Sequence, residues 1–131
     1  MKALIVEDDF TSRVLLVEIL KRYGTTHVAV NGREAVDAVR AALDAGTPYD
    51  LVCLDIMMPE MDGQEALRQI RGLEVAMGIG PQERSKVIMP TALADKENVL
   101  EAIRGQCDFF LVKPVEARRL LEELRRRNLI Q

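Results

Sequence analysis

The chain alternates short apolar runs with longer amphipathic segments, and this alternation predicts an α/β domain with a parallel sheet covered by helices on both faces. The runs are about four residues long, the length of a strand, and several are almost continuously apolar, as strands buried on both faces are. They lie at Ala3–Val6, His27–Val30, Leu51–Leu54, Lys86–Met89 and Phe109–Val112. Because five strand–helix units follow one another, right-handed crossovers fix most of the topology.

Five segments with helical spacing of apolar residues separate or follow these runs. They cover about residues 11–23, 33–45, a stretch from 63, 95–104 and a stretch from 116. Residues 72–85 contain Gly78, Gly80 and Pro81, which break helices, so we expect an expanded loop there. The run Arg125–Arg127 is expected to be a solvated helix end whose charge complements the helix dipole.

Length and composition indicate one globular domain. The 131 residues are the usual size of a single core, and we expect residues 1–131 to form one domain. A net charge of −3 gives no reason to expect nucleic acid or an anionic membrane as partner. Cys53 and Cys107 have no CxxC spacing and are expected to be buried thiols of a reducing compartment. The N-terminal apolar stretch is too short for a signal peptide or a membrane span, which predicts a cytoplasmic protein without membrane insertion.

Polar residues follow four of the predicted strands. The first strand ends in Glu7-Asp8-Asp9, the third in Asp55, the fourth in Thr91, and the fifth runs into Lys113-Pro114. Because the carboxyl ends of parallel strands share one edge, where such sheets bind ligands, these side chains are expected to converge. Each element alone is ordinary, as a helix cap, a strand end or a turn. Their joint occurrence favours a site.

Clustered carboxylates repel each other unless a cation intervenes, and a hard divalent ion such as Mg²⁺ suits such a set of oxygens. A lysine and a threonine hydroxyl can hold phosphoryl oxygens, and one carboxylate can act as nucleophile to form an aspartyl-phosphate. The only histidine, His27, lies in the second strand and is interpreted as structural or surface. No GxxxxGK[ST] or GxGxxG motif supports nucleotide binding.

The same residues resemble the response-regulator receiver domain of two-component signalling, over essentially the whole chain. The matching segments are LIVEDD from Leu4, DLVCLDIMMPEMDG from Asp50, Thr91-Ala92 and Lys113-Pro114, and DIMMPEMDG is highly specific. The resemblance implies a flavodoxin-like fold with five helices and a five-stranded parallel sheet of order 2-1-3-4-5. It also implies a cis proline at Pro114.

The resemblance assigns a role to each site residue. Asp55 is the implied phosphoacceptor, and Thr91 and Lys113 would contact the phosphoryl group. The residues implied to hold Mg²⁺, with Mn²⁺ as a possible substitute, are Asp8, Asp9, Asp55 and, through its backbone carbonyl, Met57. Phe110 matches the aromatic residue of the switch. An inward Thr91 would vacate space for it and remodel the surface of the fourth helix, fifth strand and fifth helix as a population shift.

The implied partners are a histidine kinase or a histidine phosphotransfer protein, and a downstream protein that binds the remodelled surface. We expect no direct nucleic-acid contact, a monomer or weak dimer, and a switch that catalyses only its own phosphorylation and dephosphorylation. The small Ala92 would leave the acyl phosphate accessible. Met57 and Leu93 are apolar and cannot orient an attacking water, which predicts slow self-dephosphorylation. Pro90 precedes Thr91 in a central strand, an unusual place for proline, and is expected to restrict the travel of Thr91.

Two other interpretations remain open. A phosphorylation-independent binding module would keep the fold without the chemistry, although the complete Asp/Asp/Asp/Thr/Lys set argues against it. A haloacid-dehalogenase-type phosphatase would need an aspartate two residues after Asp55, where the chain has Met57. The sequence ends at Gln131, just after the last predicted helix, without an output domain. We therefore expect either a single-domain regulator or a piece of a longer one.

Overall fold

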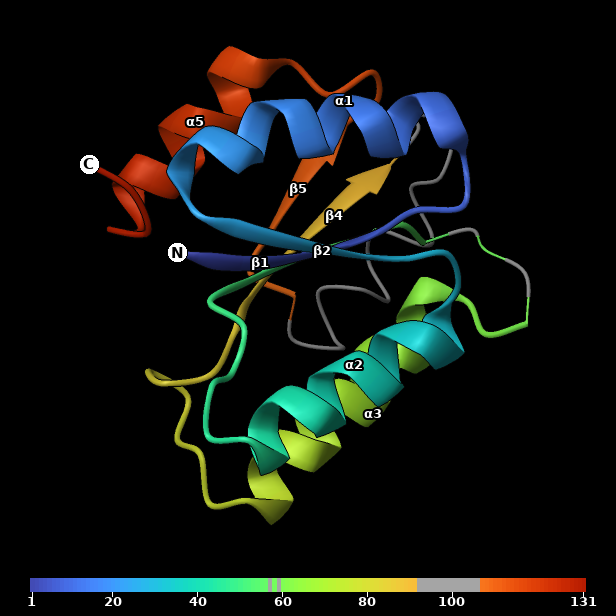
Figure 1. Ribbon diagram of the computed structural model, residues 1–131, viewed down its shortest axis with the longest axis vertical. Coiled ribbons are helices and arrows are strands. Elements are labelled where there is room, and N and C mark those ends of the chain that lie inside the picture. Colours follow the sequence, from blue (N-terminus) through green and yellow to red (C-terminus); the bar gives the residue numbers. More distant parts are fainter. Residues whose placement is uncertain (57, 59, 92–106) are drawn as a thin grey trace.

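A computed structural model describes residues 1–56, 58, 60–91 and 107–131 (Figure 1). Five parallel strands form one sheet of order β2-β1-β3-β4-β5, as the resemblance implies. The strands are β1 (Lys2–Val6), β2 (Thr25–Ala29), β3 (Leu51–Leu54), β4 (Lys86–Thr91) and β5 (Phe109–Val112). The order reverses beside β1 and β3, so the carboxyl ends of these two strands flank the position where such sheets bind ligands.

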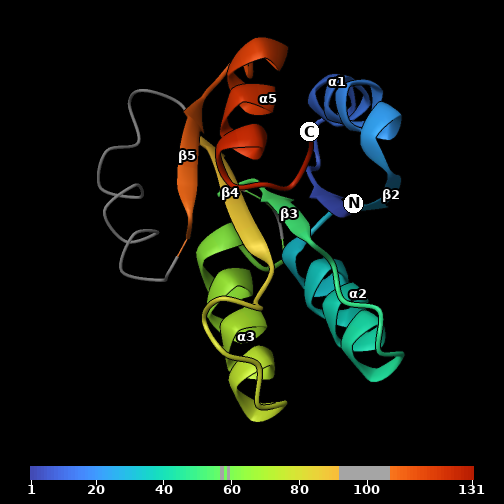
Figure 2. The ribbon, with the colours of Figure 1, turned by 90° about the vertical axis from the view of Figure 1, so that its left-hand side faces the viewer.

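Helices cover both faces of the sheet, α1 and α5 on one side and α2 and α3 on the other (Figures 1 and 2). The helices are α1 (Phe10–Leu20), α2 (Gly32–Asp44), α3 (Gly63–Ala76) and α5 (Ala117–Arg126). Side chains of β1 alternate between the two cores: Leu4 and Val6 pack against α2 and α3, while Ala3 and Ile5 pack toward α1 and α5. This alternation explains why the strands are apolar without interruption.

Several element boundaries differ from the sequence prediction; β4, for example, continues to Thr91, beyond the expected Met89. β2 begins at Thr25 and ends at Ala29, earlier than the expected His27–Val30. The first helix ends at Leu20 and continues as a 3₁₀ turn, Lys21–Tyr23. The predicted loop 72–85 is wrong for its first five residues, because α3 continues to Ala76; Gly78, with a φ of 75°, follows the C-cap residue Met77. The predicted helix 95–104 lies outside the described residues.

Arg127 corrects the prediction of a solvated basic helix end. Its guanidinium lies 4.1 Å from the ring centroid of Phe109 and also pairs with Glu123, so it fastens the end of α5 to β5. Arg126 is exposed and pairs with the same glutamate at 3.3 Å. The predicted solvated helix end is therefore wrong for Arg127, which packs against Phe109, whereas Arg126 is exposed to solvent.

Pro90 lies inside β4, the strand between β3 and β5, and its position explains where one ladder ends. The pairing of β4 with β3 stops at Cys53–Ile88, whereas its pairing with β5 continues to Thr91–Val112. Lys86 N–H donates to the carbonyl of Asp50 on the β3 side, and Lys113 N–H donates to the carbonyl of Thr91 on the β5 side. By this alternation the nitrogen of Pro90 faces β3. A proline cannot donate there, so that ladder ends.

None of the helices within the described parts of the chain is both long enough and apolar enough to cross a membrane.

Candidate metal and phosphoryl site

Three carboxylates converge at the carboxyl edge of the sheet. Glu7 and Asp8 follow β1, and Asp55 follows β3; one oxygen of each lies within 4.8 Å of the others. Backbone bonds that prolong the sheet fix this position: Asp55 N–H donates to the Val6 carbonyl and Glu7 N–H to the Ala29 carbonyl, both at 3.1 Å. Glu7 and Asp55 are buried, whereas Asp8 is exposed. The cluster is thus open to solvent on the side of Asp8.

Lys113 enters the cluster from the end of β5. Its Nζ lies 3.1 Å from Oδ1 of Asp55 and 3.8 Å from Oε1 of Glu7. Its backbone N–H donates to the Thr91 carbonyl at 2.8 Å, which places the end of β4 beside it. The peptide bond between Lys113 and Pro114 is cis, the geometry that the resemblance predicts.

The cluster carries more negative than positive charge when its carboxylates are ionised. Burial, and next the charge of Asp55, raise the pKa of Glu7 to about 7. Burial is the largest single influence on the pKa of Lys113 and lowers it, but the charge and hydrogen bond of Asp55, together with the charges of Glu7 and Asp8, outweigh burial, and the net shift is upward. Within the described residues, Oε1 of Glu7 is buried and has no hydrogen-bond partner. With Glu7 ionised, three carboxylates face one ammonium. Hard oxygen ligands with excess negative charge fit Mg²⁺ or a similar divalent cation.

Asp9, which the resemblance implies as a metal ligand, is not one of the three clustered carboxylates. It is the N-cap of α1, and its Oδ2 accepts the backbone N–H of Ser12 at 2.9 Å. This hydrogen bond lowers the pKa of Asp9. The described cluster therefore differs from the predicted ligand set by one residue, since it contains Glu7 and not Asp9. A sequence signal for this existed: Asp9 directly precedes the helix, with an acceptor side chain typical of an N-cap.

The two residues predicted to form the switch, Thr91 and Phe110, both lie in described strands. Thr91 ends β4 and is buried, and Phe110 is half-buried in β5, packed against the core between the sheet and the α2–α3 layer. Met57, whose carbonyl was predicted as a metal ligand, lies outside the described residues. Ala92 and Leu93, which bear on access and on dephosphorylation, lie outside them as well. His27 is an exposed residue whose Nδ1 lies 2.6 Å from the hydroxyl of Tyr49, consistent with a structural role.

Fold and site together define a class: a small α/β protein with a buried aspartate at a strand end, beside a lysine and two further carboxylates. The chain belongs to the response regulator receiver domain family, whose model matches residues 3–125. Receiver domains are signalling switches of two-component systems. The family membership confirms the resemblance and the interpretation as a phosphoacceptor switch.

Two curated relatives show how the domain is used elsewhere. The chain is 39% identical over 126 residues to the chemotaxis protein CheY of Listeria monocytogenes, a match that covers 95% of each chain. It is 33% identical over 132 residues to probable histidine kinase 2 of Oryza sativa subsp. indica. That match covers 93% of this chain but only 12% of the kinase. The domain thus occurs both alone and within much longer proteins.

Two solved structures are similar in fold. The receiver domain of the histidine kinase CKI1 from Arabidopsis thaliana, complexed with Mg²⁺ and BeF₃⁻, is 29% identical, with a TM-score of 0.80 and coverage of 98% and 89%. The receiver domain of Saccharomyces cerevisiae Ssk1, co-crystallised with the histidine phosphotransfer protein Ypd1, is 26% identical, with a TM-score of 0.79 and coverage of 94% and 85%.

Proposed function

We propose that this protein receives a phosphoryl group on Asp55 in a two-component phosphorelay and signals through a partner protein. The observation that carries the proposal is the buried Asp55, 3.1 Å from Lys113 and within 4.8 Å of two further carboxylates, in a chain of the receiver family. We further propose that residues 1–131 act as one receiver domain and that the protein turns over no external substrate.

The described residues favour Glu7, Asp8 and Asp55 as the side chains that hold Mg²⁺ or Mn²⁺. A role for the Met57 carbonyl remains a prediction from the resemblance. When bound, the metal would neutralise charge on the transferred phosphoryl group. The relative crystallised with Mg²⁺ and BeF₃⁻ supports the choice of ion. Asp9 is kept out of this set because its carboxylate caps α1.

The chain's own groups can carry the transfer. A carboxylate oxygen of Asp55 attacks phosphorus, an O–P bond forms, and the N–P bond to the donor imidazole breaks, leaving a neutral histidine once a proton is taken up. Lys113 is already within hydrogen-bonding distance of Asp55, so its ammonium can move to a phosphoryl oxygen with little rearrangement. We assign the second contact to the hydroxyl of Thr91, at the neighbouring strand end.

We propose that the phosphoryl donor docks beside α1. A cavity of about 290 Å³ lies beside Glu7 and Lys113, and its other lining residues include Ser12, Leu15 and Pro114. The co-crystal of a related receiver with a phosphotransfer protein supports a histidine kinase or phosphotransfer protein as donor. The output surface is proposed as the fourth helix, β5 and α5, with Thr91 and Phe110 as the switch. We expect the protein to bind no nucleic acid directly and not to insert into a membrane. We also expect it to be cytoplasmic and to be a monomer or a weak dimer.

Intact-mass measurement with acetyl phosphate tests the proposal. Wild type should gain the mass of one phosphate in Mg²⁺ and none in EDTA, whereas Asp55→Asn should gain none. Asp44→Asn, at the exposed end of α2, is the matched control and should behave as wild type. A folded wild type without phosphate uptake would favour the binding module. Continuous phosphate release from added phosphomonoesters would favour a phosphatase.

A further inference from the structure

Arg13, in the first turn of α1, contacts the backbone of the segment that carries two of the clustered acids. Its Nη1 donates to the carbonyl of Glu7 at 3.1 Å and to the carbonyl of Asp8 at 3.4 Å. The guanidinium lies 5.5 Å from the ring centroid of Phe10, and the side chain is half-buried. One side chain therefore spans two consecutive peptide units of the β1–α1 junction.

The ends of this junction are anchored by other groups. On the strand side the Glu7 N–H donates to the Ala29 carbonyl at 3.1 Å. On the helix side the Asp9 carboxylate accepts the N–H of Ser12. Arg13 adds contacts at the two carbonyls between these anchors. Because the side chains of Glu7 and Asp8 leave the chain here, fixing these peptide planes also fixes the directions in which both carboxylates point.

We infer that Arg13 is a positioning residue, which holds the β1–α1 junction so that Glu7 and Asp8 present their carboxylates together to a divalent cation. The inference rests on the proposed function and deepens it, since it concerns the same site. Residues that hydrogen-bond to metal ligands, without contacting the metal, hold those ligands in place, and their removal typically changes metal affinity by about 10–100-fold. Arg13 acts on backbone carbonyls, so the effect should lie toward the lower end of that range.

Charge and positioning predict opposite outcomes at this residue. A guanidinium near a cation site repels the cation, so its removal should tighten Mg²⁺ binding if charge alone mattered. Loss of positioning should weaken binding instead. Arg13→Met removes both charge and donors, while Arg13→Lys keeps the charge. The matched control is Arg22→Met, because Arg22 is an exposed arginine in the 3₁₀ turn beyond α1 and its loss changes the net charge equally.

The experiment is a Mg²⁺ titration of the three variants by calorimetry, with ¹⁵N relaxation of the metal-free proteins. Arg13→Met should raise the Kd about tenfold, Arg13→Lys should raise it less, and Arg22→Met should not raise it. Asp8 and Asp9 amides should become more mobile in Arg13→Met without metal. If Arg13→Met does not fold, Arg13→Gln takes its place.

Tighter or unchanged Mg²⁺ binding by Arg13→Met, with unchanged relaxation at Asp8 and Asp9, would overturn the inference. Failure of the proposed function has a different signature, because wild type itself would then bind no Mg²⁺ and take up no phosphate. In that case the relaxation data alone decide whether Arg13 orders the junction.

Discussion

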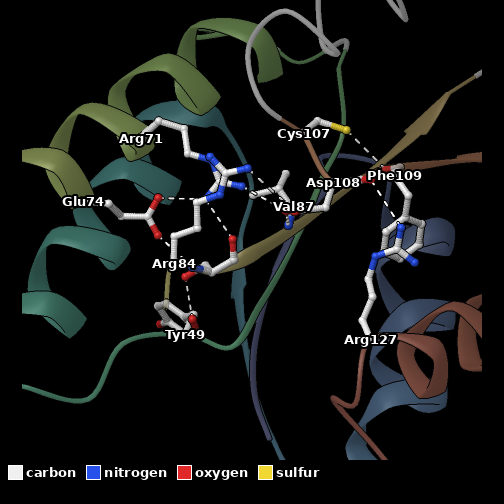
Figure 3. Close-up of polar contacts among 10 residues, drawn as sticks. Tyr49, Arg71, Glu74, Arg84, Val87, Cys107, Asp108, Phe109 and Arg127 are labelled. Carbon is white, nitrogen blue, oxygen red and sulfur yellow. Dashed lines mark hydrogen bonds and ion pairs between the residues drawn. The ribbon is translucent and has the colours of Figure 1, made fainter. Parts of the chain in front are cut away.

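The two ends of the sheet hold two clusters of charged residues, and the clusters are built on opposite principles. At the carboxyl end, Glu7, Asp8 and Asp55 face Lys113, and a buried oxygen of Glu7 has no hydrogen-bond partner in the described chain. At the amino end, Arg71 is enclosed by acceptors from several elements (Figure 3). The first cluster carries more negative than positive charge, whereas in the second Arg71 is paired with Glu74 and Asp108.

In the amino-end cluster Arg71 is hydrogen-bonded to side chains and backbone groups from several elements. Arg71 donates to Glu74 at 2.7 Å, to the Ser85 carbonyl at 2.8 Å and to Asp108 at 3.0 Å. The two carboxylates also accept backbone N–H groups, Glu74 from Ser85 at 2.8 Å and Asp108 from Val87 at 2.7 Å. The network ties α3 to the starts of β4 and β5. The contrast indicates that the carboxyl-end cluster is arranged to receive a charge from outside, whereas the amino-end cluster stabilises the fold.

The largest effect should come from breaking the amino-end cluster. Arg71→Met leaves the buried Glu74 and the half-buried Asp108 with too few donors, and loss of one partner of a buried pair costs about 3–5 kcal/mol. Urea denaturation should show this loss of unfolding free energy. Arg68→Met, three residues earlier on the exposed face of α3, is the control and should change stability little. Equal losses in both variants would contradict the comparison.

The pH dependence of stability should identify the carboxyl-end cluster. Without metal, folded Glu7 keeps its proton to about pH 7, while its ordinary value is 4.5. The folded state thus holds more protons than the unfolded state in this window, so stability falls as pH rises from 4.5 to 7 and stays low above it. A pKa raised from 4.5 to about 7 corresponds to a contribution of about 3 kcal/mol from Glu7.

Denaturation of wild type and Glu7→Gln across this pH range measures the effect. In EDTA, Glu7→Gln should lose the downward slope and be the more stable protein above pH 7, yet bind Mg²⁺ poorly. Added Mg²⁺ should flatten the slope of wild type, since it stabilises the ionised carboxylate. Glu18→Gln, on the exposed side of α1, should retain the wild-type slope. Parallel curves for wild type and Glu7→Gln would refute the raised pKa.

Two glycines of α3 should respond to alanine with opposite signs. A Cβ at Gly63 would lie 2.1 Å from the Asp55 carbonyl oxygen, so the turn that follows the phosphoacceptor must shift. We expect a loss of about 1–3 kcal/mol, as for overpacked sites, together with slower phosphorylation by acetyl phosphate. A Cβ at Gly72 meets nothing within 4 Å, and alanine there should stabilise the helix by about 0.5–1 kcal/mol. If Gly63→Ala changed neither the unfolding free energy nor the phosphorylation rate, the close approach of Gly63 to the Asp55 carbonyl would be unimportant.

The smallest expected effects distinguish the roles of Asp8 and Asp9 in Mg²⁺ binding and in stability. Asp9→Ala should slightly lower the unfolding free energy, because α1 loses its N-cap hydrogen bond, and should leave the Kd for Mg²⁺ unchanged. Asp8→Ala should do the reverse, weakening Mg²⁺ binding with little effect on stability because the residue is exposed. Calorimetric titration and urea denaturation of both variants measure this. Weaker Mg²⁺ binding in Asp9→Ala would restore the ligand set predicted from the sequence.

The sequence predicted the carboxyl end of the sheet far better than the amino end, for a physical reason. Strand ends share an edge, so Asp55 and Lys113 could be placed together from topology alone. Whether Glu7 or Asp9 joins Asp8 in the cluster depends on where α1 begins, and hydrophobic periodicity locates the start of a helix only within a few residues. Arg71 and Glu74, three residues apart, have the spacing of an ordinary exposed helix pair. Their burial depends on how α3 packs against the starts of two strands, which no local pattern encodes.

Peptide mapping tests the central claim most directly. After incubation with acetyl phosphate and Mg²⁺, borohydride trapping and proteolysis, mass spectrometry should find the modified aspartate at Asp55. Asp8 and Asp9 should be unmodified, and the modification should be absent in EDTA. Modification at another residue, or none in a protein that is folded and binds Mg²⁺, would contradict the assignment of Asp55 as the phosphoacceptor.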